Sequence, residues 1–214
     1  MLLVVSSTKQ GDEVVSTLTV WDFIDGHKDI FCKSMVPIPI LESQWNPYVQ
    51  KNSDEFVTIS DRCYHYWRIT ENLQLQYQEG EMPQKQTEGF RDKTDQFTTL
   101  TFVKPDKLHH SVYLLVGTLS GFIWVTDTRT NQFLFNVKVL DDAAGGVNRI
   151  FSSHARIVIE SNNAPTLHCW DQSGRNGDKE YSAYNPNNFF MGVESKLSID
   201  GNVKSSFYDD TGSQ

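Results

Sequence analysis

The sequence has 214 residues, of which 38% are hydrophobic, 12% aromatic and 21% charged, a balance that excludes a disordered chain and suffices for one domain with a buried core. A net charge of −8, from 27 acidic and 19 basic residues, works against attraction to phosphate groups. The densest basic run, 85–93, also contains Glu88 and Asp92. We therefore expect no nucleic acid and no membrane surface among the partners.

Cysteine usage and hydropathy indicate a soluble intracellular protein. Cys32, Cys63 and Cys169 form no C-x-x-C pair and are odd in number, so neither a disulfide framework nor a thiolate metal site is predicted. The apolar run at the start is too short for a signal peptide and lacks a basic region, and no stretch approaches the length of a membrane span.

Short strands are the predicted elements throughout, because no stretch sustains the helical period of 3.6 residues. Two long loops are predicted at 78–95 and 172–188, and a long hairpin turn at 7–15. The predicted strands recur in one order, with the two middle strands of each group nearly continuously apolar. In chain order they are 2–6, 16–22 and 30–33; 43–47, 56–60, 63–68 and 73–77; 97–102, 113–118, 121–127 and 132–137; 147–151, 156–160 and 166–171; and 203–208.

A tryptophan or a substitute closes the same strand in each group. Trp21, Trp67, Thr126 and Trp170 hold this place at intervals of 46, 59 and 44 residues, against about 40–45 residues for one propeller blade. A β-sandwich would show turn signals but no such recurrence. The sequence therefore predicts an all-β propeller of about four degenerate four-stranded blades, approximately 1–36, 37–80, 96–140 and 146–200, with 201–214 opening another.

The strand endings carry a family resemblance. Val20-Trp21-Asp22 and Cys169-Trp170-Asp171 match the ending typical of WD repeats, Val125-Thr126-Asp127 matches it in part, and Tyr66-Trp67-Arg68 keeps only the tryptophan. The chain thus resembles the WD-repeat β-propeller family over nearly its whole length. No Gly-His pair precedes an opening strand, so the buried network of His, Ser or Thr, Asp and Trp that the family uses cannot be assembled in full.

Within that family the chain looks most like the large axonemal WD-repeat proteins of cilia and flagella. The features shared with them are the long hairpin turn at 7–15, the Trp45-Asn46-Pro47 turn and the weakly kept tryptophans. The resemblance implies a non-catalytic scaffold on doublet microtubules, located in the cytoskeleton of the axoneme, with axonemal proteins and tubulin as partners. A WD-repeat scaffold subunit of a non-ciliary intracellular complex is the alternative.

The number of blades indicates an incomplete ring. The first predicted strand falls at the second position of a blade and the last at a first position, and four blades is the lower limit for propellers. We therefore expect about half of a propeller, belonging to a longer chain.

Catalytic, cofactor and metal sites are not predicted. The pair His109-His110 lies in a polar turn without further ligands, and the sequence has neither a G-x-S-x-G nucleophile elbow nor a phosphate-binding G-x-x-x-x-G-K-[ST] loop. A propeller enzyme with a site at the channel mouth is the least favoured alternative. Tyr48, Tyr181 and Tyr184, in predicted turns, are the candidate partner contacts.

Overall fold

The computed structural model describes residues 1–11, 13–22, 29–48, 54–80, 95–104, 112–152, 156–163, 166–171 and 193–198. All regular elements in these ranges are β-strands. A search of them for a helix long and apolar enough to cross a membrane finds none. The strands form four antiparallel sheets, and the chain divides into two compact units, Met1–Gly80 and Glu81–Gln214.

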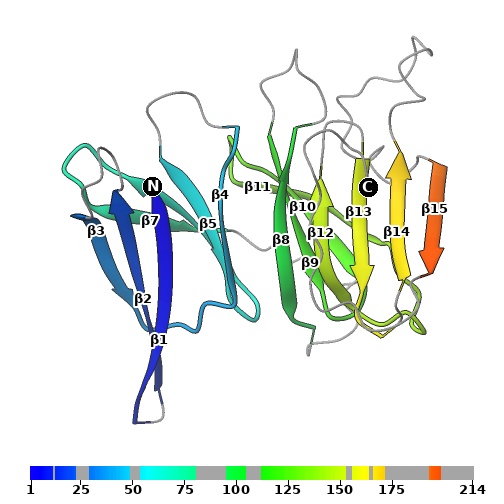
Figure 1. Cartoon of the computed structure of the whole chain (residues 1–214), viewed down its shortest axis with the longest axis horizontal. Coiled ribbons are helices and arrows are strands. Elements are labelled where there is room, and N and C mark those ends of the chain that lie inside the picture. The colour runs from blue at the N-terminus through cyan, green and yellow to red at the C-terminus, as the bar shows by residue number, and fades with distance from the viewer. Residues whose placement is uncertain are drawn as a thin grey trace. The chain divides into compact units, whose positions relative to one another are not determined.

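The first sheet of the first unit has three strands in the order β1-β2-β3 (Figure 1). They are β1 (Leu2–Gln10), β2 (Glu13–Asp22) and β3 (Asp29–Val36). The ladder between β1 and β2 runs without interruption from Leu2 opposite Trp21 to Gln10 opposite Glu13.

The long turn predicted at 7–15 is therefore wrong. Thr8, Val14 and Val15 are β-branched residues that favour strand, and they extend both strands of the hairpin. The chain reverses between Gln10 and Glu13, where Gly11 has a φ of 66° that glycine adopts without steric cost. The outcome is a two-stranded ribbon that continues beyond Ser16 and Val36, the last pair between β2 and β3 (Figure 1).

The second sheet of this unit comprises β4 (Glu42–Trp45), β5 (Glu55–Ile59), β6 (Tyr64–Ile69) and β7 (Leu75–Glu79), hydrogen-bonded in that order. The loop predicted at 78–95 begins later than expected, because Gln78 and Glu79 belong to β7. Alternate residues of β2 and β3 pack against this sheet and form the core of the unit, which contains Leu18, Val20, Cys32, Val36, Phe56 and Trp67.

The second unit contains two four-stranded sheets. One comprises β8 (Phe97–Val103), β9 (Tyr113–Thr118), β10 (Phe122–Asp127) and β11 (Gln132–Lys138), and the other β12 (Val147–Ser152), β13 (Arg156–Ser161), β14 (Thr166–Asp171) and β15 (Val193–Ser198). All six residues of β9 are buried. The sequence analysis named no strand at β15, where three polar residues separate Val193 from Leu197.

The two sheets of the second unit meet at their innermost strands, β8 and β12. Thr98 Oγ1 donates a hydrogen bond to the carbonyl of Val147 over 2.5 Å, and Ser152 Oγ donates to the carbonyl of Phe102 over 2.5 Å. At Gly117 a Cβ atom would lie 2.6 Å from Val147 Cγ1, so the close approach of the sheets requires glycine there. These contacts fix the position of one sheet against the other.

A buried tryptophan joins the middle strands of the second sheet. Trp67 is 1% exposed, and its ring lies parallel to that of Phe56 with 5.7 Å between centroids. Its indole Nε1 donates a buried hydrogen bond of 2.9 Å to Thr58 Oγ1 on β5. This buried Trp–Thr pair links the two middle strands of the sheet.

Replacing Thr58 with valine tests this pair, because Thr58→Val keeps the shape of the side chain and removes the acceptor. The indole donor then stays buried without a partner, which costs about 1–3 kcal/mol. Urea unfolding followed by tryptophan fluorescence should show this loss. Thr58→Ser, which keeps the hydroxyl, is the control and should lose less. A Thr58→Val protein at least as stable as Thr58→Ser would contradict the assignment.

Candidate interaction surface

Groups that could carry chemistry are few in the described part of the chain. No cluster of three or more His, Cys, Asp or Glu side chains that could hold a metal ion is present there. Burial raises the pKa of the Cys63 thiol, against a hydrogen bond from Ser60 Oγ at 2.7 Å that lowers it. Burial raises the pKa of Cys32 as well. Because the thiolate is the reactive form, both thiols are poor nucleophiles.

A buried carboxylate of the second unit serves a hairpin turn. Asp95 is buried just before β8, at the end of the loop predicted at 78–95. Its Oδ1 accepts from the backbone N–H of Ser120 at 2.9 Å and of Gln96 at 3.0 Å, and its Oδ2 accepts from Ser120 Oγ. The carboxylate thus ties the turn between β9 and β10 to the start of β8, and these bonds occupy both of its oxygens.

The repeat positions predicted from the sequence occupy equivalent places in the strand ladders. Each lies opposite the first or second residue of the strand that precedes it in the chain. The pairs are Trp21 with Leu2, Trp67 with Phe56, Thr126 with Leu114 and Trp170 with Ile157. The sheets therefore share one register, even where threonine replaces tryptophan.

The aspartates that follow these positions end their strands at Asp22, Asp127 and Asp171. Asp127 Oδ1 accepts from the backbone N–H of Arg129 at 2.8 Å and so shapes the turn between β10 and β11. The side chains of Trp170 and Asp171 are outside the described residues. The hydrogen bonds of Trp67 and Asp127 lie within their own sheets.

The tyrosines predicted as partner contacts remain predictions. Tyr48 lies in the turn after β4, half-buried, and its backbone N–H donates to Asn46 Oδ1 at 3.1 Å. Tyr181 and Tyr184 lie outside the described residues, as do His109, His110 and the strand predicted at 203–208.

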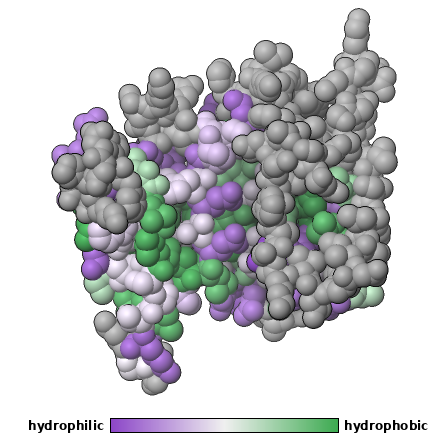
Figure 2. Space-filling view, in the orientation of Figure 1, coloured by the Kyte–Doolittle hydropathy of each residue, from purple (hydrophilic) through white to green (hydrophobic). Residues whose placement is uncertain are grey.

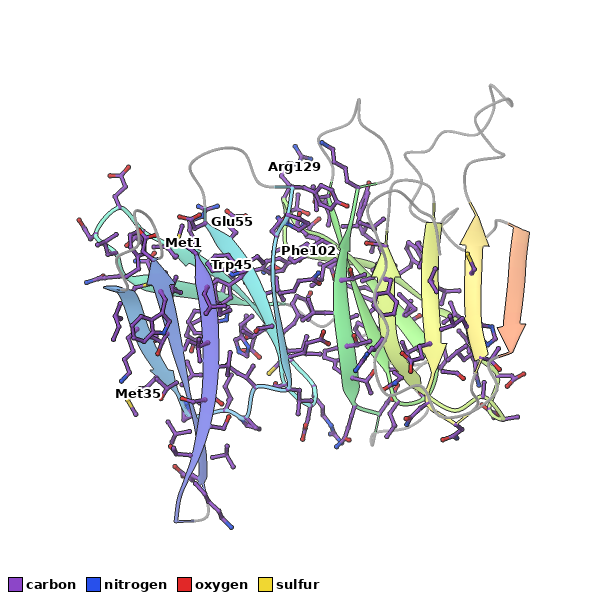
Figure 3. The ribbon with its side chains drawn as sticks, viewed as in Figure 1. Met1, Met35, Trp45, Glu55, Phe102 and Arg129 are labelled. Carbon is purple, nitrogen blue, oxygen red and sulfur yellow. The ribbon has the colours of Figure 1, made fainter. Side chains whose placement is uncertain are left out.

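One exposed apolar surface was missed by the sequence analysis. Leu2, Val4, Ile30 and Met35 are 47%, 39%, 54% and 58% exposed, and the register of the first sheet sets them on the face opposite Leu18 and Val20. We call this surface the outer face. Figure 3 shows Met35 pointing away from β3.

The outer face is the strongest candidate for binding another protein. Figure 2 shows that the side chains toward the tip of the ribbon are polar. Contiguous exposed apolar residues on a folded protein mark interaction surfaces. The sequence carries no signal for this face, because residues 2–5 are all apolar and only the register separates Leu2 and Val4 from the core-packed Leu3 and Val5.

A buried histidine lies beneath the exposed strand β7. His65 is buried, its ring meets the edge of Tyr77 at 5.2 Å between centroids, and its Nδ1 has no hydrogen-bond partner among the described residues. Burial lowers the pKa of His65 below its ordinary 6.5, and the nearby charge of Glu79 opposes that shift only in part. The imidazole is therefore neutral in the folded chain at neutral pH.

The lowered pKa of His65 predicts acid sensitivity. Below pH 6.5 the unfolded chain binds a proton more readily than the folded chain, so the contribution of His65 to stability is complete above that pH and is lost as the pH falls through the folded pKa. Denaturant midpoints measured from pH 7.5 to 5 should decline, and His65→Phe should lessen the decline. An equal decline in both proteins would refute the role of His65.

Comparison with known proteins identifies the fold. No family model matches the sequence, and a search of curated proteins finds no match. Among solved structures the chain is similar to the β-propeller domain of Cps50 (Swd1) from Myceliophteria thermophila, at 14% identity and a TM-score of 0.55, over 81% of this chain and 52% of that one. A humanized mutant of the Chaetomium thermophilum Polycomb Repressive Complex 2 matches at 14% identity and a TM-score of 0.49, over 63% and 28%.

The chain spans about half the length of the Cps50 domain. The strand order agrees with that likeness, since each sheet is an antiparallel series in chain order. The prediction of an all-β propeller is confirmed: the chain has a β-propeller fold, with three four-stranded sheets and one of three described strands.

Proposed function

We propose that this chain is a non-catalytic scaffold that binds other proteins. The observation that carries the proposal is the outer face, where four large apolar side chains stand exposed on a well-formed sheet. Exposure of such a surface to water is unfavourable. Binding of a protein partner that covers it is stabilised by burial of the apolar side chains. The likeness to a propeller domain at 14% identity supports the fold. The proposal of a binding function is based on the outer face.

The described groups that could carry chemistry have structural surroundings. The buried Asp95 is bonded to its own hairpin turn, and burial raises the pKa of the thiols of Cys32 and Cys63. A propeller enzyme would need polar groups that converge on a pocket and are available to bind a substrate. These three groups are engaged in the structure of the sheets.

The specific assembly that we propose is the ciliary or flagellar axoneme, with tubulin and axonemal proteins as partners. Support comes from the sequence resemblance to axonemal WD-repeat proteins. In the structure, Trp45 ends β4 and packs its ring edge-on against Phe56 at 5.0 Å, and Asn46 caps the turn that follows. A scaffold subunit of a non-ciliary intracellular complex would use the same outer face and is the competing assignment.

Cross-linking mass spectrometry on isolated axonemes tests the assembly. Lys9 and Lys33 are exposed on the first sheet, and we expect them to cross-link to tubulin or to axonemal proteins. The soluble fraction of the same cells is the control. If the cross-links of these lysines join only soluble proteins, the axonemal assignment fails and the non-ciliary complex takes its place.

A matched pair of variants tests the outer face as the binding surface. Met35→Glu introduces a charge on this face, and Leu73→Glu introduces one at a similarly exposed apolar residue in the turn between β6 and β7. Burying an unpaired charge is strongly unfavourable, so Met35→Glu should reduce co-purification of the cross-linked partners by about tenfold or more. Leu73→Glu should leave it unchanged. Equal recovery with both variants would contradict the proposal.

A further inference from the structure

His65 is buried on the face of β6 that packs against the first sheet. It is 4% exposed, and Trp67, two residues along the same strand, belongs to the core shared with β2 and β3. The two rings lie 6.4 Å apart between centroids. His65 Nδ1 has no hydrogen-bond partner within the described ranges. Such a site suits a neutral imidazole, because an imidazolium carries a charge and a hydrogen-bond donor at each nitrogen.

The charge that acts on His65 comes from the neighbouring strand β7. Glu79 lies opposite His65 in the ladder, and its charge opposes the lowering of the imidazole pKa by burial only in part. Tyr77 of the same strand meets the imidazole at 5.2 Å between centroids. On the other side, β5 sets the uncharged Thr58 opposite His65. The first sheet contributes the Cys32 thiol to the adjoining core, and burial raises the pKa of that thiol.

The two aromatic rings beside His65 are held with different firmness. Trp67 is 1% exposed, stacks on Phe56 and donates a hydrogen bond to Thr58. Tyr77 is 53% exposed and lies on β7, the last strand of its sheet, where four of five residues are exposed. Displacing Tyr77 together with β7 therefore removes little apolar burial, whereas displacing Trp67 would break the core.

We propose that protonation of His65 releases β7 from the second sheet while β4, β5 and β6 stay paired. Release moves Tyr77 off the imidazole and lets water reach it. Burial lowers the pKa of His65 in the closed form, and water restores it toward 6.5 in the released form. The released form therefore binds the proton more readily, and its population rises as the pH falls below that value. The loss of stability in acid thus begins at one strand.

Alternate amides of β6 distinguish release of β7 from unfolding of the whole unit. The N–H of Gly80 donates to the carbonyl of the first residue of β6, and the N–H of Ile69 donates to the carbonyl of Asp54, just before β5. Successive residues of an antiparallel strand bond to opposite neighbours. The amide of Tyr66 therefore bonds to β7, and the amide of Trp67 bonds to β5.

Native-state hydrogen exchange of the whole chain at low urea concentrations tests the release. The amides of Tyr66 and Gln78, which bond across β6 and β7, should be protected about tenfold less than that of Trp67. Their exchange should depend weakly on urea, because release of one strand exposes little surface. The amide of Trp67 should exchange through unfolding of the unit, with a steep dependence on urea. Equal protection and equal slopes for the two sets would overturn the inference, and this comparison needs no variant.

Acid provides the second comparison. Between pH 7.5 and 5.5, with rates corrected for the intrinsic effect of pH, protection of the Tyr66 and Gln78 amides should fall by about tenfold, the effect of one pH unit below the 6.5 of the released form. Its urea dependence should stay weak. In His65→Phe, or in His65→Leu where phenylalanine prevents folding, the protection should not change with pH. An equal fall in the variant, or a steep urea dependence at pH 5.5, would contradict the release of β7.

Discussion

Burial of both faces of each sheet is the constraint on which this structure depends. A four-stranded antiparallel sheet with apolar residues on both faces is stable in water only when neighbouring sheets cover both faces. β9 meets that condition with all its residues buried. β2 is buried at alternate positions only, which leaves the opposite face of the first sheet apolar and exposed. Among the described residues, the candidate interaction surface is thus a sheet face that no neighbouring sheet covers.

Polar groups inside the sheets are placed so that the packing can be close. The hydroxyl of Thr58 accepts from the indole of Trp67, and the carboxylate of Asp95 accepts from both the backbone and the side chain of Ser120. Each bond links neighbouring strands or a turn to a strand, so it satisfies a buried group and fixes the register at once. His65 lacks such a partner at Nδ1 among the described residues, and its burial lowers the pKa of the imidazole.

The sequence predicts the buried strands well and the exposed ones poorly. β9 and β14 have the predicted bounds, Tyr113–Thr118 and Thr166–Asp171, because continuous apolar runs bounded by turn residues permit one interpretation. The ribbon of β1 and β2 was predicted as a turn, since Lys9, Gln10 and Glu13 are polar and its pairing is between backbones. β15 escaped prediction for the same reason. The pattern of apolar side chains along the sequence reflects burial. A strand pair whose side chains are exposed therefore gives little signal in that pattern.

The same limit explains why the candidate site could not be predicted. The repeat positions Trp67 and Thr126 were found because they recur at blade spacing, and in the structure both are buried, Trp67 in the core of the first unit. Leu2 and Val4 are unremarkable apolar residues until the register with β2 sets them on an uncovered face.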